Sequence, residues 1–379
     1  MPPIAGFRGV VADATRAKSL IDRAKDQAGT AERDPVRAMF RYHQTFADPV
    51  TGRTLTRKLI YAAIRVAPYA EGIVRPHLAS EPARRDAAIA ELKSTRTQSV
   101  PVLASFKDPP MEVERLFRKT ESERSILDHV GPDGVVHRIW RVRDASTIGA
   151  LRTQFGPRKL TILDGHEYYE AAQALEAQLD AERPLLQYAS PKFALGCLVN
   201  VEDQALTTIP RHRIIRGGPP IAEALVSAKK FFIIESLPAA AATDYTVARK
   251  ALEDTLAHQP SFVLVAGGQA HKLTLSPDIS VSGEGVAVHR SVQKFDPVVA
   301  DELFVGRCMP GAKIETTIDA KVALGAKGDA ALIMRPLTIE QVRQVVEIGE
   351  ILPAGSSAFY PPLVPGLLQF IVDPDEDLV

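Results

Sequence analysis

Cysteine is scarce in this chain, because Cys197 and Cys308 are the only two among 379 residues and they stand in different segments. Their separation excludes a C-x-x-C metal site and argues against a disulfide framework. Net charge is absent as well, because 46 basic side chains balance 46 acidic ones. A neutral composition gives no support for a nucleic-acid partner or an acidic membrane surface.

Long apolar runs and several well-known motifs are also missing. No run approaches the roughly 20 residues of a membrane span. The start, Met1-Pro-Pro-Ile-Ala-Gly-Phe-Arg8, lacks the basic stretch and apolar core of a secretion signal. We therefore expect no membrane partner and a cytoplasmic location. The sequence contains no G-x-x-x-x-G-K-[ST], no G-x-G-x-x-G opening a helix, no H-E-x-x-H and no G-x-S-x-G.

The chain has the composition of a globular protein, with 45% hydrophobic and 24% charged residues. Strand-like and helix-like segments alternate without an internal repeat, which predicts an α/β fold of the mixed α+β kind. The turn Arg216-Gly-Gly-Pro-Pro220 is the best candidate for a domain boundary. We expect a core domain over 1–215 and a second α/β domain over 216–379 that packs back on the core.

Local patterns predict several further features. Segments 126–130 and 135–142 flank a turn and indicate a hairpin, and Gly267-Gly268 is typical of a hairpin turn rather than a phosphate cradle. Residues 205–215 are expected to form a strand. The proline-rich segment 353–366 is expected to contain no regular element, and the acidic tail 373–377 is expected to fray.

The most informative stretch runs from Lys159 to Leu175. It predicts a buried strand, a tight turn at Asp164-Gly165 and then a helix. Such a corner places a carboxylate, the imidazole of His166 and the backbone N–H groups of a helix N-terminus together, and these groups can hold an anion. An ordinary corner with Asp164 as a helix-capping residue is the alternative interpretation.

Three other polar clusters are candidates for a site. Arg211, His212 and Arg213 interrupt an apolar strand, which favours either a position facing a ligand or a solvated edge, and Arg213 can pair with a phosphate or carboxylate through two hydrogen bonds. Ser356 and Ser357 suit a loop that closes over a ligand, or a packed C-terminal wrap. His77, between Pro76 and Leu78, is the third candidate, although a single histidine is more often structural.

In this order the clusters resemble one family, the bacterial and archaeal proteins that contain domain of unknown function 1015. The resemblance extends nearly end to end. The segments that carry it are Ile4-Ala-Gly-Phe-Arg-Gly9 for "I-x-P-F-R-G", Tyr42-His-Gln-Thr-Phe46 for "Y-x-Q-x-F", Arg75-Pro-His-Leu-Ala-Ser80 for "P-H-E-x-T", Leu163-Asp-Gly-His-Glu-Tyr-Tyr-Glu-Ala-Ala172 for "A-D-G-H-H-R-Y-E-A-A", Ile209-Pro-Arg-His-Arg213 for "L-P-T-H-R" and Pro353-Ala-Gly-Ser-Ser-Ala-Phe-Tyr-Pro-Pro362 for "P-P-K-S-T-x-F-Y-P-K".

The D-G-H-H-R pattern is also similar to the core motif of the ParB–sulfiredoxin superfamily, which includes free-serine kinases. The resemblance implies a ParB/sulfiredoxin-like strand–turn–helix core and phosphoryl transfer from ATP, ADP or pyrophosphate, with Mg²⁺, to a small hydroxylated substrate such as L-serine. It implies that Asp164 orients Mg²⁺ or the acceptor hydroxyl. His166 and the turn, with Gly165, would contact phosphate, and Arg213 with His212 would hold a carboxylate or phosphate oxygen.

The resemblance extends the binding set to His77, Tyr168, Glu170, Ser356 and Ser357, but the chain also departs from the pattern. Glu167 and Tyr168 replace the second His and the Arg of the family motif, and a glutamate repels a phosphate that an arginine would attract.

Further departures affect other polar positions of the family pattern. Leu78 replaces a Glu, and Gly355 and Pro362 replace two Lys. A kinase-like enzyme of altered activity, with Asp164, His166 and Glu167 as catalytic residues, is one hypothesis. A degenerate protein that binds a small anion or a protein partner is the other.

Overall fold

The computed structural model describes residues 3–22, 33–256, 258–326 and 328–379. The chain forms two compact units. Unit 1 comprises Met1–Pro76, Ser80–Thr207 and Phe359–Val379, and unit 2 comprises His77–Ala79 and Thr208–Ala358. The units therefore divide at residues 207/208, and the C-terminal segment returns to unit 1. The division into a core domain over 1–215 and a second α/β domain over 216–379 stays a prediction.

Unit 1 is a mixed α/β unit built on one large sheet. Its strands are β1 (Ile4–Ala5), β2 (Val10–Val11), β3 (Met39–Ala47), β4 (Thr54–Arg65), β5 (Val74–Arg75), β6 (Thr97–Gln98), β7 (Val102–Phe106), β8 (Leu127–Val130), β9 (Val136–Val142), β10 (Leu160–Asp164), β11 (Phe193–Asn200) and β20 (Leu368–Ile371). Its helices are α1 (Ala14–Ile21), η1 (Tyr69–Glu71), α2 (Pro82–Thr95), α3 (Glu112–Arg115), α4 (Arg118–Glu121), α5 (Ala145–Phe155), α6 (His166–Glu182) and η2 (Ser190–Lys192).

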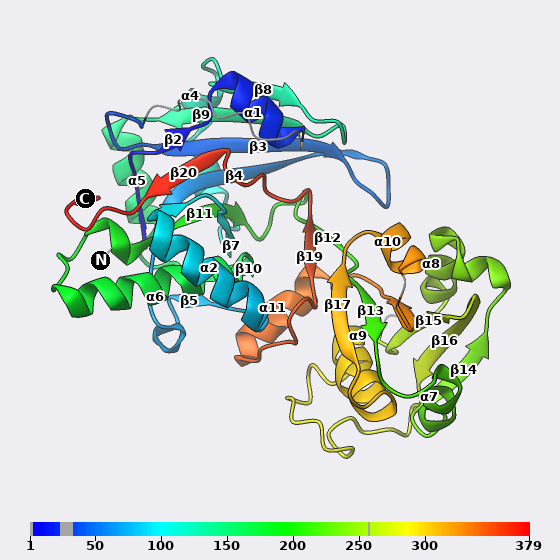
Figure 1. Cartoon of the computed structure of the whole chain (residues 1–379). Helices are drawn as coiled ribbons and strands as arrows, with labels where there is room; N and C mark the ends of the chain where they lie inside the picture. The colour runs from blue at the N-terminus through cyan, green and yellow to red at the C-terminus, as the bar shows by residue number, and fades with distance from the viewer. Residues whose placement is uncertain (1–2, 23–32, 257, 327) are drawn as a thin grey trace. The chain divides into compact units, whose positions relative to one another are not determined.

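The large sheet has the strand order β5-β10-β7-β11-β4-β3-β9-β8, with β1 added to β4. β3 and β4 are its longest strands and lie side by side (Figure 1). All eight residues of β11 are buried, and six consecutive residues of β4, from 59 to 64, are buried as well. A strand covered on both faces shows a continuous apolar run instead of alternation. For this reason the apolar pattern of residues 58–67 by itself fits a strand or a helix equally well.

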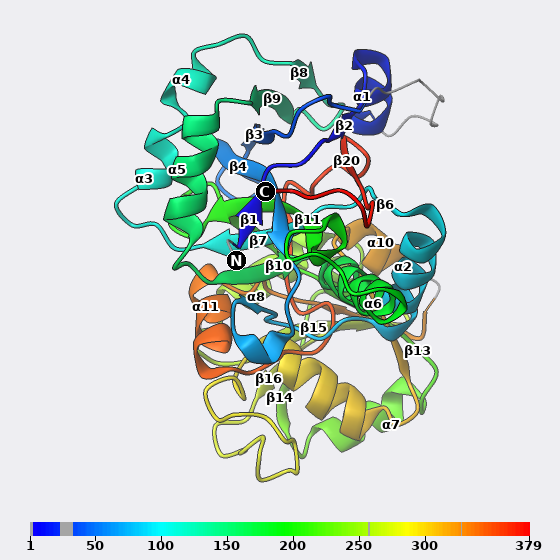
Figure 2. The ribbon, with the colours of Figure 1, turned by 90° about the vertical axis from the view of Figure 1, so that its left-hand side faces the viewer.

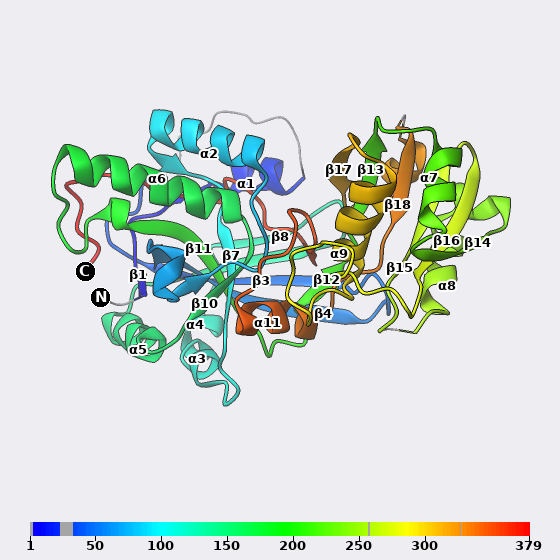
Figure 3. The same ribbon diagram turned by 90° about the horizontal axis from the view of Figure 1, so that it is seen from below.

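The core of unit 1 joins one face of this sheet to its helices. Ile60, Ala104 and Leu198 belong to the same buried cluster as Leu92 of α2, Leu151 of α5 and Leu175 of α6. α2 and α6 run next to each other along the sheet (Figure 3), whereas α3, α4 and α5 lie together elsewhere in the unit (Figure 2). The apolar spacing of residues 13–27 predicts an amphipathic helix; α1 covers its first part, and residues 23–27 lie outside the described residues.

The C-terminal tail is ordered by specific contacts within unit 1. β20 pairs with β2 and with β6, and beyond it the amide of Ser190 donates to the carbonyl of Glu376 at 2.8 Å. The amide of Leu378 donates to Tyr188 O at 3.0 Å. The expectation of a frayed tail at 373–377 was therefore wrong, because this segment supplies backbone acceptors to the chain near η2.

Unit 2 is a second α/β unit with its own core. Its strands are β13 (His212–Arg216), β14 (Phe232–Ser236), β15 (Ser261–Ala266), β16 (Gln269–Leu275), β17 (Lys313–Thr317) and β18 (Ala330–Ile333). Its helices are α7 (Ile221–Ala228), η3 (Ala239–Ala242), α8 (Tyr245–Glu253), α9 (Asp296–Val298), the π-helix η4 (Val299–Cys308), α10 (Ala320–Gly325) and α11 (Ile339–Ile348). The sheet order is β14-β16-β15-β18-β13-β17. The mixed α/β class is thus confirmed.

Two local predictions are confirmed and two are corrected. The 126–142 hairpin is β8–β9, and Gly267-Gly268 joins β15 to β16. The strand expected over 205–215 is interrupted at Pro210, which has no N–H for a strand ladder, and becomes β12 (Thr207–Ile209) and β13. The segment 353–366 contains a short strand, β19 (Ala358–Tyr360), so the expectation of no regular element was wrong.

Candidate functional site

The corner between β10 and α6 has the predicted strand–turn–helix form. β10 ends at the exposed Asp164, Gly165 adopts a left-handed conformation with φ of 80°, and the 17-residue helix α6 begins at His166. A Cβ on residue 165 would lie 3.2 Å from Val102 Cα and 3.3 Å from the carbonyl oxygen of Pro101. Glycine is therefore required here for its backbone conformation and for its lack of a side chain.

The N-terminus of α6 has no side-chain cap. Gly165 is the N-cap residue, and Tyr168 and Tyr169 both donate their amides to its carbonyl oxygen at 3.1 Å. Asp164 instead accepts the amide of Gly165 through Oδ1 at 2.9 Å. In this geometry Gly165, and not Asp164, is the N-cap residue of α6. The exposed carboxylate lies one residue before a positive helix end.

The first residues of α6 differ in how deeply they are buried. His166 is 2% exposed and Glu167 is 9% exposed. Tyr168 is half-buried; burial raises the pKa of its phenol, and the charge of Arg84 on α2 opposes that rise. Glu170 accepts hydrogen bonds from Ser80 Oγ at 2.8 Å and from Tyr69 OH at 3.4 Å. Glu170 is therefore already engaged with its own unit.

An open-sided pocket adjoins Tyr168 between α2 and α6. It has room for about one water molecule and is lined by Ala88, Glu91, Leu92, residues 97–100, Tyr168 and Ala171. Its walls combine small apolar side chains with one carboxylate and one phenol ring. Tyr168 is a candidate site residue of unit 1 that lines this shallow pocket.

The buried Arg57 of unit 1 carries a positive charge that interacts with the corner carboxylate, Asp164. Arg57 is 0% exposed and donates to Gln44 Oε1, to the carbonyl of Tyr360 at 3.3 Å and to the carbonyl of Pro361. Burial lowers the pKa of Arg57, while the negative charges of Asp203 and Asp164 are among the groups that raise it. The corner carboxylate therefore lies within electrostatic range of a cation that solvent does not reach.

Unit 2 holds the other predicted site residues. Arg213 is 1% exposed, and its Nε and Nη2 bind the two carboxylate oxygens of Asp301 at 2.9 and 2.8 Å. Its Nη1 donates to the carbonyls of Arg211 at 2.6 Å and Gly355 at 3.1 Å. The predicted two-bond pairing with a carboxylate is thus made inside the unit. β13 lies between β18 and β17, so the expected solvated edge was wrong.

His212 is also buried, at 1% exposed. Its Nδ1 accepts the amide of Met334 at 3.1 Å, so Nε2 carries the hydrogen of the neutral ring. Burial, with the charge of Arg213, lowers the pKa of His212 to about 4. The imidazole is therefore neutral at pH 7.

His77, Ser356 and Ser357 form a packed contact within unit 2. His77 Nε2 lies 2.7 Å from Ser357 Oγ, and Ser356 Oγ donates to Pro353 O at 2.6 Å. Backbone bonds between His77 and Leu352 (3.1 Å) and between Ala79 and Leu352 (2.8 Å) hold the segments together. All three side chains are buried, so of the two interpretations of this segment the geometry shows a packed wrap.

The structure thus groups the predicted residues into two sets. Unit 1 contains Asp164, Gly165, His166, Glu167, Tyr168 and Glu170, and unit 2 contains His77, His212, Arg213, Ser356 and Ser357. Their roles in ligand binding stay predictions. Among the described residues no three His, Cys, Asp or Glu side chains converge on a possible metal position. In the same part of the chain no helix has the length and apolar character of a membrane span.

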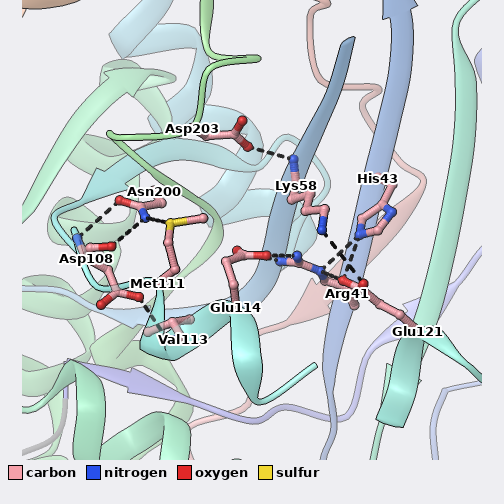
Figure 4. A network of polar contacts seen from close by, with 10 residues as sticks. All are labelled: Arg41, His43, Lys58, Asp108, Met111, Val113, Glu114, Glu121, Asn200 and Asp203. Atoms are coloured by element: carbon pink, nitrogen blue, oxygen red, sulfur yellow. Dashed lines mark hydrogen bonds and ion pairs between the residues drawn. The ribbon is translucent and has the colours of Figure 1, made fainter. Parts of the chain in front are cut away.

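A charged cluster on β3, β4, α3 and α4 was missed from the sequence (Figure 4). It comprises Arg41, His43, Lys58, Glu114 and Glu121, and Arg41 is 0% exposed. The signal was present, because Arg41 and His43 interrupt the strand 39–46 as Arg211 to Arg213 interrupt theirs. The acidic partners lie more than seventy residues away in the chain, and no local pattern identifies them.

Two α/β units with a strand–turn–helix corner define the class of this protein, and the sequence places it in a family. The chain matches the family described as "Protein of unknown function (DUF1015)" over residues 10–301 and belongs to that family. The family resemblance found in the motifs is therefore confirmed. No curated protein matches the chain.

Several solved structures resemble the chain loosely. A conserved hypothetical protein from Pyrococcus furiosus is 13% identical, with a TM-score of 0.42 over 83% of this chain and 96% of that one. A free serine kinase in complex with AMP is 15% identical, with a TM-score of 0.43 over 84% and 93%. SbnI from Staphylococcus aureus, with a C-terminal truncation, is 13% identical, with a TM-score of 0.40 over 84% and 90%. Likeness at these values carries no conclusion about activity.

Proposed function

We propose that this protein is a kinase-like small-molecule enzyme of altered activity. It transfers a phosphoryl group from a nucleotide or pyrophosphate to a small hydroxylated substrate such as L-serine, at the β10–α6 corner. The observation that carries the proposal is the exposed Asp164 beside the uncapped N-terminus of a 17-residue helix. Phosphoryl transfer depends mainly on positioned N–H donors, cations and a carboxylate, and less on covalent chemistry by the protein.

We assign the roles of the corner residues according to how exposed each one is. Backbone N–H groups at the start of α6, other than the Gly165 amide that Asp164 already accepts, hold a phosphate at the positive helix end. Asp164 orients the acceptor hydroxyl, and Tyr168 contacts the ligand from the adjoining pocket. His166, at 2% exposed, supports the turn from within.

Mg²⁺ fits this corner only together with substrate phosphates. A single exposed carboxylate does not make a metal site by itself, but Mg²⁺ is commonly held by one or two carboxylates together with substrate phosphates and water. Asp164 would hold the ion, and the ion would neutralise phosphate charge. The chain would supply one carboxylate, and the phosphates would supply further oxygen ligands. Mg²⁺ and nucleotide are therefore expected to bind together and not separately.

The second candidate function is a non-catalytic protein that binds a small anion or a partner. Two observations favour it. Glu167 places a carboxylate in the first turn of α6, where it competes with a phosphate for the positive helix end. Arg213, the cation expected to hold an anionic group, is neutralised by Asp301 at 2.8 Å.

The test compares melting temperatures with ATP, ADP or pyrophosphate, each with and without Mg²⁺, and then measures phosphoserine formation from L-serine. A ligand that binds only the native state raises the melting temperature. The wild type and Asp164→Asn are compared, because asparagine keeps the oxygen that accepts the Gly165 amide but removes the charge. A Mg²⁺-dependent shift that Asp164→Asn loses supports the proposal, and no shift with any phosphate donor contradicts it.

A double variant separates the two candidate functions. Glu167→His with Tyr168→Arg removes the repelling carboxylate and adds a cation at the helix end. Phosphoryl transfer in the double variant alone identifies the natural protein as a binding protein with lost chemistry. Transfer by the wild type identifies it as an enzyme.

A further inference from the structure

The His43 cluster of unit 1, defined by Arg41, His43, Lys58, Glu114 and Glu121, lies outside the proposed site. Arg41 is fully buried, pairs with Glu114 and donates through Nε to Glu121 Oε1 at 2.7 Å. Its guanidinium lies over the ring of Phe117, 4.6 Å from the centroid. Glu114 and Glu121 both bind the guanidinium of Arg41, so one positive charge is shared by two negative charges. Glu121 can therefore also accept a hydrogen bond from another neighbour.

That charge fixes the tautomer of His43. Glu121 Oε1 lies 3.0 Å from His43 Nε2, and the pKa of Glu121 is lowered to about 2 by its bonds to His43 and Arg41 against the effect of burial, so this oxygen is an acceptor. The single hydrogen on Arg41 Nε is in donating geometry to both Glu121 Oε1, at 2.7 Å, and His43 Nε2, at 3.1 Å, and we assign it to the shorter bond with the charged acceptor. With this assignment His43 Nε2 carries its own hydrogen and donates it to Glu121. The lone pair of the neutral ring resides on Nδ1.

The ring is held in place but remains accessible. Trp140 packs edge-on against it at 4.8 Å between centroids, and the side chain of His43 is 13% exposed. Figure 4 shows one ring nitrogen directed at Arg41 and Glu121 and the other directed away from them. Burial lowers the pKa of His43, so the ring is neutral at pH 7. A carboxylate that orients one nitrogen and leaves the other unprotonated activates a histidine as a nucleophile.

Cationic residues lie opposite His43 on both neighbouring strands. Lys58 on β4 and Arg138 on β9 lie directly opposite His43 in the antiparallel ladders and share its face of the sheet. Their side chains are 41% and 50% exposed. Lys58 Nζ lies 3.9 Å from Glu121, and Arg138 binds Asp128 at 2.8 Å. A group with two or three negative oxygens attached at His43 would be placed between these two cations.

We propose that His43 is a phosphohistidine site, modified on Nδ1 by a small high-energy phosphate donor such as an acyl phosphate or phosphoramidate. The lone pair of Nδ1 attacks phosphorus, the Nδ1–P bond forms, and the bond from phosphorus to the leaving group breaks with its electron pair. The ring becomes a phosphoimidazolium, whose Nε2 hydrogen stays bonded to Glu121, and Lys58 and Arg138 neutralise the phosphoryl oxygens. This step needs no nucleotide and is independent of the function proposed for the Asp164 corner.

The experiment treats the full chain with potassium phosphoramidate at pH 7 and measures acid-labile phosphate at each histidine by peptide mass spectrometry and ³¹P nuclear magnetic resonance. His129 is the matched control, because its Nε2 also lies 2.9 Å from a carboxylate, Asp22, and its side chain is 21% exposed, but its cross-strand partner is His137 instead of a cation. We expect His43 to be labelled about tenfold faster than His129, since nearby cations favour the phosphorylated product.

Two variants complete the test. His43→Gln keeps an N–H donor for Glu121 and removes the nucleophile, so labelling of that peptide is lost. Lys58→Met leaves the imidazole unchanged and slows labelling of His43 severalfold, with circular dichroism as the check on folding. Equal labelling of His43 and His129, or unchanged labelling in Lys58→Met, overturns the proposal.

Discussion

Asp164 at the end of β10 and Arg213 within β13 were both selected from the sequence as ligand-binding charges, and the structure treats them in opposite ways. Asp164 is exposed and its recorded hydrogen bond is to a neighbouring backbone amide. Arg213 is buried and makes four hydrogen bonds within its own unit. A charge at the surface can be contacted by a ligand from solvent, whereas removing one partner of a buried ion pair destabilises the fold. This contrast determines which variants should affect stability and which should affect binding.

The largest effect is expected at the buried pair of unit 2. Asp301→Asn leaves the guanidinium of Arg213 buried without its counter-ion, which costs about 3–5 kcal/mol in the free energy of unfolding. The measurement is urea unfolding of the full chain. As a control, the double variant Arg213→Met/Asp301→Leu removes both charges and should recover most of the loss. If Asp301→Asn unfolds at the same urea concentration as the wild type, the pair does not stabilise unit 2.

Lowering the pH should decrease the stability of unit 2 through protonation of His212. The pKa of His212 is lowered to about 4 in the folded protein, so the unfolded chain binds a proton at higher pH than the folded one. The free energy of unfolding therefore falls as the pH decreases from about 6.5 to 4, by roughly 2–3 kcal/mol from this group. His212→Gln should flatten that part of the curve. Parallel curves for the variant and the wild type would contradict the assignment.

A substitution at Gly165 tests whether the turn between β10 and α6 requires a residue without a side chain. Gly165→Ala should lower stability by about 2–3 kcal/mol, because a Cβ would be strained at φ of 80° and crowded against Val102. Gly268→Ala is the matched control, since its φ is 75° and nothing lies within 4 Å of a Cβ there. The control should cost about 1 kcal/mol. Equal losses in thermal unfolding would show that the close approach at residue 165 has no cost.

Asp164 should show the smallest effect on stability. Asp164→Asn removes an exposed charge and keeps the oxygen bonded to Gly165, so the free energy of unfolding should change by less than about 0.5 kcal/mol. Urea unfolding without ligands is the measurement. A large decrease in the free energy of unfolding would show that Asp164, like Arg213, stabilises the fold, and it would contradict the difference between the two sites.

The sequence predicted local structure better than it predicted the surroundings of charged residues. The hairpin at 126–142 and the corner at 160–166 follow from patterns spanning few residues, namely alternation, Gly-containing turns and helix formers. Arg213 was placed at a strand edge or facing a ligand because its partner, Asp301, lies 88 residues further along the chain. The His43 cluster was missed for the same reason, since Glu121 lies 78 residues away from His43.

By itself the sequence determined the mixed α/β class, the family and the turn at Asp164-Gly165, because each depends on local backbone preferences or on an ordered set of motifs. The tertiary structure alone decided which charges are available. It paired Arg213 with Asp301, packed Ser357 against His77, and placed His43 between Lys58 and Arg138. Burial and counter-ions are contributed by segments distant in the chain, so a residue's type and neighbours in sequence cannot fix the energy of its charge.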